Sequence, residues 1–522
     1  MRATPPTARR LTAALLLAFG IAGGSAAAQG IAPGQAGPGP GPVPLAAPWP
    51  DVRSALGATG VRQVQAEMPS PPEPSLPGGA PSTTAGAAPD AGGTSPVPGV
   101  DLSEPRAESP IGGGGEPTQA DAQQGEEEDD EEPEPTLLMK ALGLEDSPVK
   151  IYGWIQNSYT GNTNGKPPSG TNFGVNPNNR ANEWMGNQYY LIVENPLEQN
   201  DKVNFGFRAD NLFGHDAQFN HATGFADNAF RPNSFTQYDL AQIYGEVHLP
   251  VLTKGGIDVK GGRWYTLAGY EVVPAIARPL LSVPYMFNYG QPFTHFGVLT
   301  TTHLTDRINL YNGAINGWDR WINARYKWGY IGGFSWNSKD GKTTLAFTTV
   351  WGPNQFPNFL SPGLFPFPTG VTTNPAFVGR RNFGYGDNTR ILFTTVLTRK
   401  WTDKLTQVLE TDQAHEQNIP FLAANGGPQS AEWYSFGNWF LYQFNDKLTG
   451  VWRSEVFRDD DGVRTGFADT FYEFTLGLVY KPTSWLWIRP EARYDWAQFK
   501  NPYNDGTRGS QLTLGIDAIF LY

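Results

Sequence analysis

The sequence predicts an all-β protein, a transmembrane, antiparallel, up-and-down β-barrel of about 16 strands, preceded by a disordered N-terminal segment. Three observations predict this fold. The chain ends on an amphipathic strand, segments with a two-residue alternation recur from residue 149 onward, and the connections between them alternate between short and long.

The final strand, residues 511–522, alternates between two kinds of side chain. One face carries Leu512, Leu514, Ile516, Ala518, Phe520 and Tyr522, and the other carries Gln511, Thr513, Gly515 and Asp517. An amphipathic last strand with a terminal aromatic residue is typical of a membrane barrel, where it closes the wall and anchors it at the interface. The alternative is an ordinary edge strand of a soluble sheet.

The N-terminus predicts export. Arg2, Arg9 and Arg10 precede an apolar run at residues 11–19, and a small-residue cleavage site ends at Ala28, so residues 1–28 form a predicted signal peptide. No later stretch approaches the ~20 consecutive apolar residues of a spanning helix, and the mean hydropathy is −0.40. Only helices and closed barrels satisfy every backbone group in hydrocarbon. The exported protein is therefore either soluble or a barrel in the cell outer membrane.

Residues 29–135 are rich in Pro, Gly and Ala and end in an acidic run at residues 126–132. Such a segment buries too little apolar surface to fold, so it is predicted to be a disordered periplasmic segment. Residues 29–148 hold 19 acidic and 4 basic side chains, which leaves 31 of each sign from residue 149 onward. The barrel is thus neutral, and nucleic acid is not an expected partner. The chain has no Cys.

Residues 136–148 form a predicted short helical segment ahead of the first strand. Two placements fit its apolar composition. It either enters the barrel mouth as a plug or packs on the barrel rim.

The barrel domain covers residues 149–522, where sixteen segments alternate or are enriched in aromatic and β-branched residues. They are 149–160, 184–195, 202–212, 238–249, 257–265, 294–303, 307–315, 329–337, 342–351, 389–400, 405–414, 432–444, 447–458, 471–481, 485–496 and 511–522. The link after every even segment is short and the link after every odd segment is longer. Short periplasmic turns, long outer loops and an even strand number are typical of outer-membrane barrels.

On two predicted strands the alternation separates a polar face from an apolar face. Gln242, Tyr244, Glu246 and His248 oppose an apolar set, as do Arg489, Glu491, Arg493 and Asp495. Charges facing lipid cost about 2–4 kcal/mol each near the midplane, so the polar faces are predicted to line a wet lumen. A barrel of about 16 strands leaves an aqueous channel.

Several motifs carry a family resemblance. They are residues 285–299 (YMFNYGQPFTHFGVL), 261–264 (GGRW), 269–271 (GYE), 213–217 (FGHDA) and 316–319 (NGWD). As a set they resemble the OmpL-like family of outer-membrane β-barrel porins, over roughly residues 137–522. The resemblance implies an outer-membrane location and a barrel architecture more than any particular solute.

The third outer loop, residues 266–293, is unusually apolar for an exterior connection. We expect it to fold into the lumen, as in general porins, with Glu271 and Arg278 near a constriction. The alternative is a loop packed over the rim or against a neighbouring subunit of a homo-oligomer.

The predicted pore lining combines these charges with the polar faces of the strands. It comprises Arg208, Asp210, Gln242, Glu246, Glu271, Arg278, Arg453, Glu455, Glu473, Arg489, Glu491, Arg493 and Asp495. Opposite signs close together either create a transverse field across the lumen or neutralise each other structurally. The six His show no metal-ligand spacing, and no catalytic residues, metal or cofactor are expected.

These features favour a passive diffusion channel for small hydrophilic solutes or ions, in contact with outer-membrane lipid. A second hypothesis is a structural anchor whose acidic segment contacts a periplasmic partner. A third is a barrel-borne hydrolase, for which His295 and His303 lie on one strand without an evident nucleophile beside them.

Overall fold

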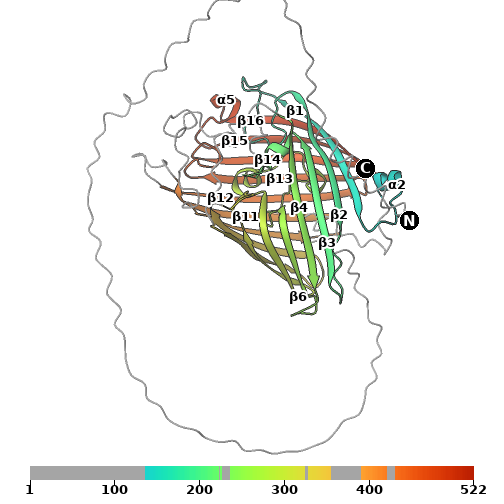
Figure 1. Ribbon diagram of the computed structural model, residues 1–522. Helices are drawn as coiled ribbons and strands as arrows, with labels where there is room; N and C mark the ends of the chain where they lie inside the picture. The colour runs from blue at the N-terminus through green and yellow to red at the C-terminus, as the bar shows by residue number, and fades with distance from the viewer. Residues whose placement is uncertain (1–135, 223, 226–234, 324–326, 354–388, 420–428) are drawn as a thin grey trace, which may run out of the picture. The chain divides into compact units, whose positions relative to one another are not determined.

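The computed structural model describes residues 136–222, 224–225, 235–323, 327–353, 389–419 and 429–522. Sixteen antiparallel strands close into a barrel in which each strand pairs with its sequence neighbours and β16 pairs with β1. Figure 1 shows these strands side by side, with the ring closed between the first and last of them. The predicted fold class and strand number are confirmed.

The strands are β1 (Lys150–Asn162), β2 (Glu183–Asn195), β3 (Asn204–Gly214), β4 (Gln237–Leu249), β5 (Ile257–Tyr265), β6 (Thr294–Thr305), β7 (Ile308–Ile315), β8 (Gly329–Asn337), β9 (Thr343–Pro353), β10 (Thr389–Lys400), β11 (Leu405–Ile419), β12 (Gln429–Asn445), β13 (Leu448–Asp459), β14 (Asp469–Thr483), β15 (Leu486–Ala497) and β16 (Ser510–Leu521). The helical elements are α2 (Leu137–Leu142), η3 (Asp216–Gln218), η4 (Ala275–Ala277), η5 (Met286–Gly290) and α5 (Tyr503–Gly506). Each strand lies within a few residues of its prediction, and the short and long connections alternate as expected.

The seam between β1 and β16 is closed by the last residue of the chain. Tyr522 exchanges both backbone hydrogen bonds with Gly153, at 2.9 and 3.1 Å. Its hydroxyl donates to the Tyr190 carbonyl at 2.8 Å, across the neighbouring strand. A Cβ at Gly153 would lie 1.9 Å from that carbonyl oxygen, so the close approach requires glycine here. The terminal aromatic residue therefore ties three consecutive strands together.

The outer wall is apolar and the inner wall is polar, as the alternation predicts. On β16, Leu512, Leu514 and Ile516 are exposed, whereas Gln511, Thr513 and Asp517 are buried inside the barrel. Exposed aromatic residues also mark both ends of the wall. Trp184 and Trp351 lie at the ends that carry the long loops, and Trp401 and Trp485 lie in the short turns. Aromatic girdles at both interfaces are typical of outer-membrane barrels.

The helix α2 lies at the end of the barrel where the C-terminus is marked in Figure 1. Thr136 caps it by accepting a hydrogen bond from the Met139 amide, and Gly143 ends it in the left-handed conformation. Met139 and Leu144 pack against Ile151, Leu191 and Val193. Because these three strand residues belong to the outward faces of β1 and β2, the helix packs on the outside of the wall at the rim.

No helix in the described part of the chain is long and apolar enough to cross a membrane. The predicted signal peptide at residues 1–28 and the predicted periplasmic segment at residues 29–135 lie outside the described residues.

The outward orientation of Leu476 and Leu478 on β14 predicts that a charged side chain on this face lowers the stability of the barrel. Leu476 is 51% exposed, between Trp452 and Ala492 on the neighbouring strands. We expect Leu476→Arg to lower the free energy of unfolding in phospholipid vesicles by about 2–4 kcal/mol. Leu476→Phe, the control, should change it little. Equal stability of the Arg variant and the native chain would contradict the assigned facing.

Candidate functional site

The third outer loop, residues 266–293, lies inside the barrel. Gln188 of β2 donates to the Val273 carbonyl and accepts from the Ala275 amide, at 2.8 and 3.0 Å. Glu455 of β13 binds the same loop further along, at Tyr285 and Met286. Strands β2 and β13 are well separated in the closed ring. A segment that reaches both of them must cross the interior, so the loop is in the lumen.

Wall carboxylates accept hydrogen bonds from the loop backbone. Glu455 accepts from the Tyr285 and Met286 amides at 2.6 and 2.5 Å. Glu491 accepts from Leu281 and Ser282 at 3.0 and 3.1 Å, and Glu410 accepts from Tyr270 at 2.9 Å. Buried backbone N–H groups need acceptors, and an irregular loop supplies few of its own. The carboxylates take that role here.

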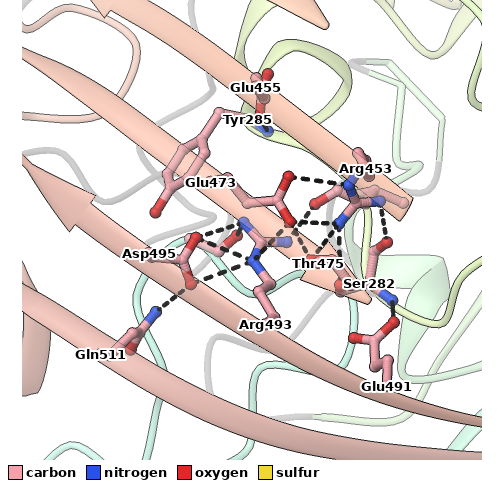
Figure 2. Close-up of polar contacts among 12 residues, drawn as sticks. Ser282, Tyr285, Arg453, Glu455, Glu473, Thr475, Glu491, Arg493, Asp495 and Gln511 are labelled. Atoms are coloured by element: carbon pink, nitrogen blue, oxygen red, sulfur yellow. Dashed lines mark hydrogen bonds and ion pairs between the residues drawn. The ribbon is translucent and has the colours of Figure 1, made fainter. Parts of the chain in front are cut away.

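Wall arginines donate hydrogen bonds to carbonyl groups of the loop. Figure 2 shows two of these arginines, Arg453 and Arg493, with their partners. Arg453 donates to the Ser282 carbonyl at 2.6 Å, and Arg493 donates to that of Val283 at 2.6 Å. Arg489 donates to the carbonyls of Ala275 and Arg278, at 2.9 and 2.6 Å. The three arginines project from β13 and β15. Strands β13 and β15 therefore supply both donors and acceptors to the loop.

The same arginines form buried ion pairs with carboxylates on the wall. Arg453 pairs with Glu473 at 3.0 Å, Arg493 with Asp495 at 2.9 Å, and Arg489 with Asp517 at 2.6 Å. A charge removed from water must be paired and hydrogen-bonded. Pairing along the wall and hydrogen bonding to the loop together meet that requirement.

Two of the predicted pore-lining residues belong to the loop itself. Glu271 accepts from Trp439 Nε1 at 3.1 Å and faces Arg453 Nη1 at 3.4 Å. Burial raises the pKa of the Glu271 carboxyl, against the opposing effect of Arg453 and Arg278. Arg278 Nη2 lies 3.3 Å from Asp216, and burial lowers the pKa of this arginine. Glu271 is buried against the wall, and Arg278 is buried against the second outer loop.

The structure divides the predicted residues into two groups. The first lies where the loop meets the wall and contains Glu271, Arg278, Arg453, Glu455, Glu473, Arg489, Glu491, Arg493 and Asp495. The second lies on β3 and β4 and contains Arg208, Asp210, Gln242 and Glu246. In that group Arg208 pairs with Asp210 at 2.7 Å, and Glu246 pairs with Lys260 at 3.4 Å.

Aromatic rings fill the outer mouth above the first group. Phe173 of the first outer loop packs against Tyr289, Phe467, Phe471 and Tyr503. The hydroxyl groups of Tyr285 and Tyr503 lie 3.1 Å apart. The first, third, seventh and eighth outer loops therefore meet in one aromatic cluster.

Several residues of the site escaped the sequence analysis. Glu410, Gln188 and Asp216 bind the third loop or its side chains, and Asp517 pairs with Arg489. The inward orientation of Asp517 was predictable, because this residue lies on the polar face of the final strand. Asp216 lies within a family motif. Nothing in the local sequence distinguishes Glu410 or Gln188 from other inward polar residues.

A family model described as "Putative beta-barrel porin-2, OmpL-like" matches residues 148–522. The chain belongs to this family. It is an outer-membrane β-barrel porin, which confirms the resemblance seen in the motifs. A comparison with curated proteins finds no match.

Three similar solved structures illustrate the likeness in fold. The outer membrane channel DcaP of Acinetobacter baumannii is 9% identical with a TM-score of 0.46, over 72% of this chain and 97% of that one. An anion-selective porin from Comamonas acidovorans is 10% identical with a TM-score of 0.46, over 72% and 99%. OprB of Pseudomonas putida is 11% identical with a TM-score of 0.45, over 76% and 100%.

The anchoring of the loop predicts a local effect of Glu455. We expect Glu455→Ala to speed amide hydrogen exchange at Tyr285 and Met286 roughly tenfold or more, because hydrogen bonds to a charged group contribute about 1.5–3 kcal/mol each. The measurement is exchange followed by mass spectrometry on the folded barrel. Glu432→Ala, at an exposed glutamate of β12, is the control. Unchanged exchange in the Glu455 variant would contradict the anchoring.

Proposed function

We propose that this porin is a passive diffusion channel for small hydrophilic solutes or ions, with a lumen narrowed by the third outer loop. One observation carries the proposal. The loop crosses the interior of a 16-stranded barrel and is fixed there by hydrogen bonds to β2, β11, β13 and β15. A barrel of this size without an inserted segment leaves a wide aqueous channel. The loop reduces that width.

The side of the barrel away from β13 to β15 supports a route for water and solutes. The side chains of Arg208 and Glu194 are 22% and 17% exposed, whereas that of Arg493 is fully buried. Arg208 forms ion pairs with Glu194 and Asp210 at 3.0 and 2.7 Å. Charged side chains that retain contact with water suit the wall of a wet passage. We therefore propose that the path passes Arg208 and Glu194, on the halves of β3 and β2 that lead to their short turn.

The charges along this path favour dipolar solutes. Arg208 and Lys260 alternate with Glu194, Asp210 and Glu246 on adjacent strands. Close charges of opposite sign create a field across the passage rather than along it, which orients water and polar molecules. This arrangement supports diffusion of small hydrophilic solutes of either charge sign.

We also infer that the protein catalyses no reaction. The family to which it belongs is described as porins. His295, the residue considered for a hydrolase, is fully buried, and its ring nitrogens lie against the Thr266 hydroxyl and the Gly317 carbonyl. A lipid ester would have no access to this ring. Residues 1–28 and 29–135 remain a predicted signal peptide and a predicted periplasmic segment.

Chemical modification of a single introduced cysteine tests whether the loop narrows the lumen. The chain has no Cys, so Val273→Cys introduces a unique thiol on the loop near the outer mouth. We expect a charged thiol reagent added from the outer side to lower the single-channel conductance in planar bilayers. Its bulk and charge would occupy the narrowed section of the lumen.

Lys166→Cys, at an exposed position of the first outer loop, is the control for this experiment. It should be modified without a change in conductance. Complete modification of the Val273→Cys variant with unchanged conductance would contradict the narrowing.

A further inference from the structure

Basic side chains are concentrated on one part of the periplasmic rim, where the short turns lie. The turns that join β8 to β9, β10 to β11, β12 to β13 and β14 to β15, with the strand ends beside them, form a basic arc with a net charge of +4. Its basic residues are Lys339, Lys342, Arg399, Lys400, Lys404, Lys447 and Lys481, and its acidic residues are Asp340, Asp403 and Asp446. Lys339, Lys404 and Lys447 are exposed.

The other short turns carry no such excess of charge. Those that join β2 to β3, β4 to β5 and β6 to β7 hold the basic residues Lys202, Lys254 and Arg307 and the acidic residues Glu198, Asp201 and Asp306. Beside the start of β1, Lys140 and Lys150 are matched by Glu145 and Asp146. Among the described residues of this rim, the excess of positive charge is therefore confined to one side.

Contacts within the basic arc leave its charge largely in place. Asp340 lies 3.9 Å from Arg399, and both side chains are exposed to water, at 53% and 37%. Lys447 donates to the Pro482 carbonyl at 3.2 Å, which is a neutral acceptor. The Lys481 ammonium lies 4.0 Å from the centroid of the Trp487 ring. The arc therefore presents positive charge to an anionic partner.

The chain itself supplies such a partner close to the arc. Thr136 Oγ1 donates to the Ile151 carbonyl of β1 at 3.1 Å, which fixes this point of the chain at the rim. The acidic run at residues 126–132 ends four positions earlier and consists of seven Glu and Asp residues. An extended chain spans at most about 3.6 Å per residue, so residue 132 reaches roughly 14 Å from Thr136 and residue 126 reaches roughly 36 Å.

Three turns of the basic arc lie within this reach. Because β1 pairs with β16, the turn between β14 and β15 is two to three strands from β1 in the ring. At about 5 Å per strand this is roughly 15 Å, and the turn between β12 and β13 is at roughly 25 Å. The run can therefore contact Lys481 and Lys447, and Lys404 in the next turn lies near its limit.

We propose that the acidic run docks on the basic arc and gives this side of the periplasmic mouth a net negative charge. Seven carboxylates exceed the net charge of +4 on the arc. One exposed ion pair is weak, but a run attached through four residues meets the arc at a high effective concentration and with several charges at once. Negative charge at the mouth attracts cations and repels anions. Since the barrel domain is neutral, the run then sets the ion preference.

Anionic lipid head groups are the competing occupant of the arc, because basic clusters beside a membrane attract them. Lys202 separates attraction by charge from mere proximity to the run. Its turn lies one to two strands from β1, closer than any turn of the arc, and also carries Glu198 and Asp201. A run that only moves near its attachment point would meet Lys202 most often. A run that docks by charge would meet Lys447 and Lys481 instead.

The test of docking is zero-length cross-linking of the full chain with a carbodiimide, which joins a carboxylate to an amine in contact with it. Mass spectrometry of the folded protein in phospholipid vesicles locates the cross-links. We expect those from residues 126–132 to Lys447 and Lys481 to exceed those to Lys202 by about fivefold or more, because the charge of the arc concentrates the run there. They should fall steeply at about 1 M salt, where the Debye length is about 3 Å.

Two outcomes would overturn docking. One is cross-linking to Lys202 as often as to the arc. The other is the absence of cross-links to the arc in vesicles and in detergent alike. Cross-links that form in detergent and disappear only in vesicles with anionic lipid would assign the arc to lipid head groups and also overturn the proposal. Lys447→Gln with Lys481→Gln should abolish the cross-links to these turns, whereas Lys202→Gln should leave them unchanged.

The reversal potential in a potassium chloride gradient tests the charge at the mouth. We expect the native chain to prefer potassium, and a variant with the seven acidic residues replaced by their amides to shift toward chloride. The control replaces Asp51, Glu67, Glu73, Asp90 and Asp101, which lie further from Thr136, and should keep the native potential. An unchanged potential in the seven-residue variant would refute the effect on ions.

This second measurement rests on the proposed function, whereas the cross-links do not. A native chain that forms the expected cross-links and does not conduct refutes the channel and leaves docking in place. A chain that conducts and forms no cross-links to the arc keeps its function as a channel and refutes docking. All variants carry their changes outside the barrel wall or at its rim, and circular dichroism checks that the barrel folds.

Discussion

Hydrogen bonding of charged wall side chains to the backbone of the third outer loop is the interaction on which the rest of this structure depends. Hydrocarbon requires every backbone group of the wall to be paired, and the closed ring of strands meets that requirement. The loop inside the ring has no neighbouring strand whose backbone could pair with its own. Glu455, Glu491 and Arg453 supply its partners instead. Apolar side chains of the loop such as Val273 and Phe287 pack on β1 to β4, so the loop is held on two sides of the lumen.

This arrangement also explains the mixture of signs on β13 to β15. Carboxylates accept from amides of the loop and arginines donate to its carbonyls, so an irregular backbone needs both. Each charge also needs a counter-charge, because an unpaired ion in a buried site is far more costly than a paired one. Arg453 with Glu473 and Arg493 with Asp495 meet this need on adjacent strands or along one strand.

The wall was predictable from the sequence and the interior was only partly so. Strands such as β5 and β8 match their predicted bounds because alternation and turn residues are local signals. The apolar composition of residues 266–293 also predicted a covered loop. The partners of that loop were harder to predict, because Gln188 and Glu410 lie 87 and 140 positions from the loop residues that they bind. Such distant contacts leave no local pattern.

The third outer loop lies in the lumen, and we propose that it narrows the lumen. The most direct test is the single-channel conductance of a variant in which residues 272–290 are replaced by a short Gly/Ser link, compared with the native chain in the same bilayer and salt. We expect a clearly larger conductance for the variant, because the section of the lumen filled by the loop becomes available to ions. Equal conductance of a folded variant and the native chain would contradict narrowing of the lumen by the loop.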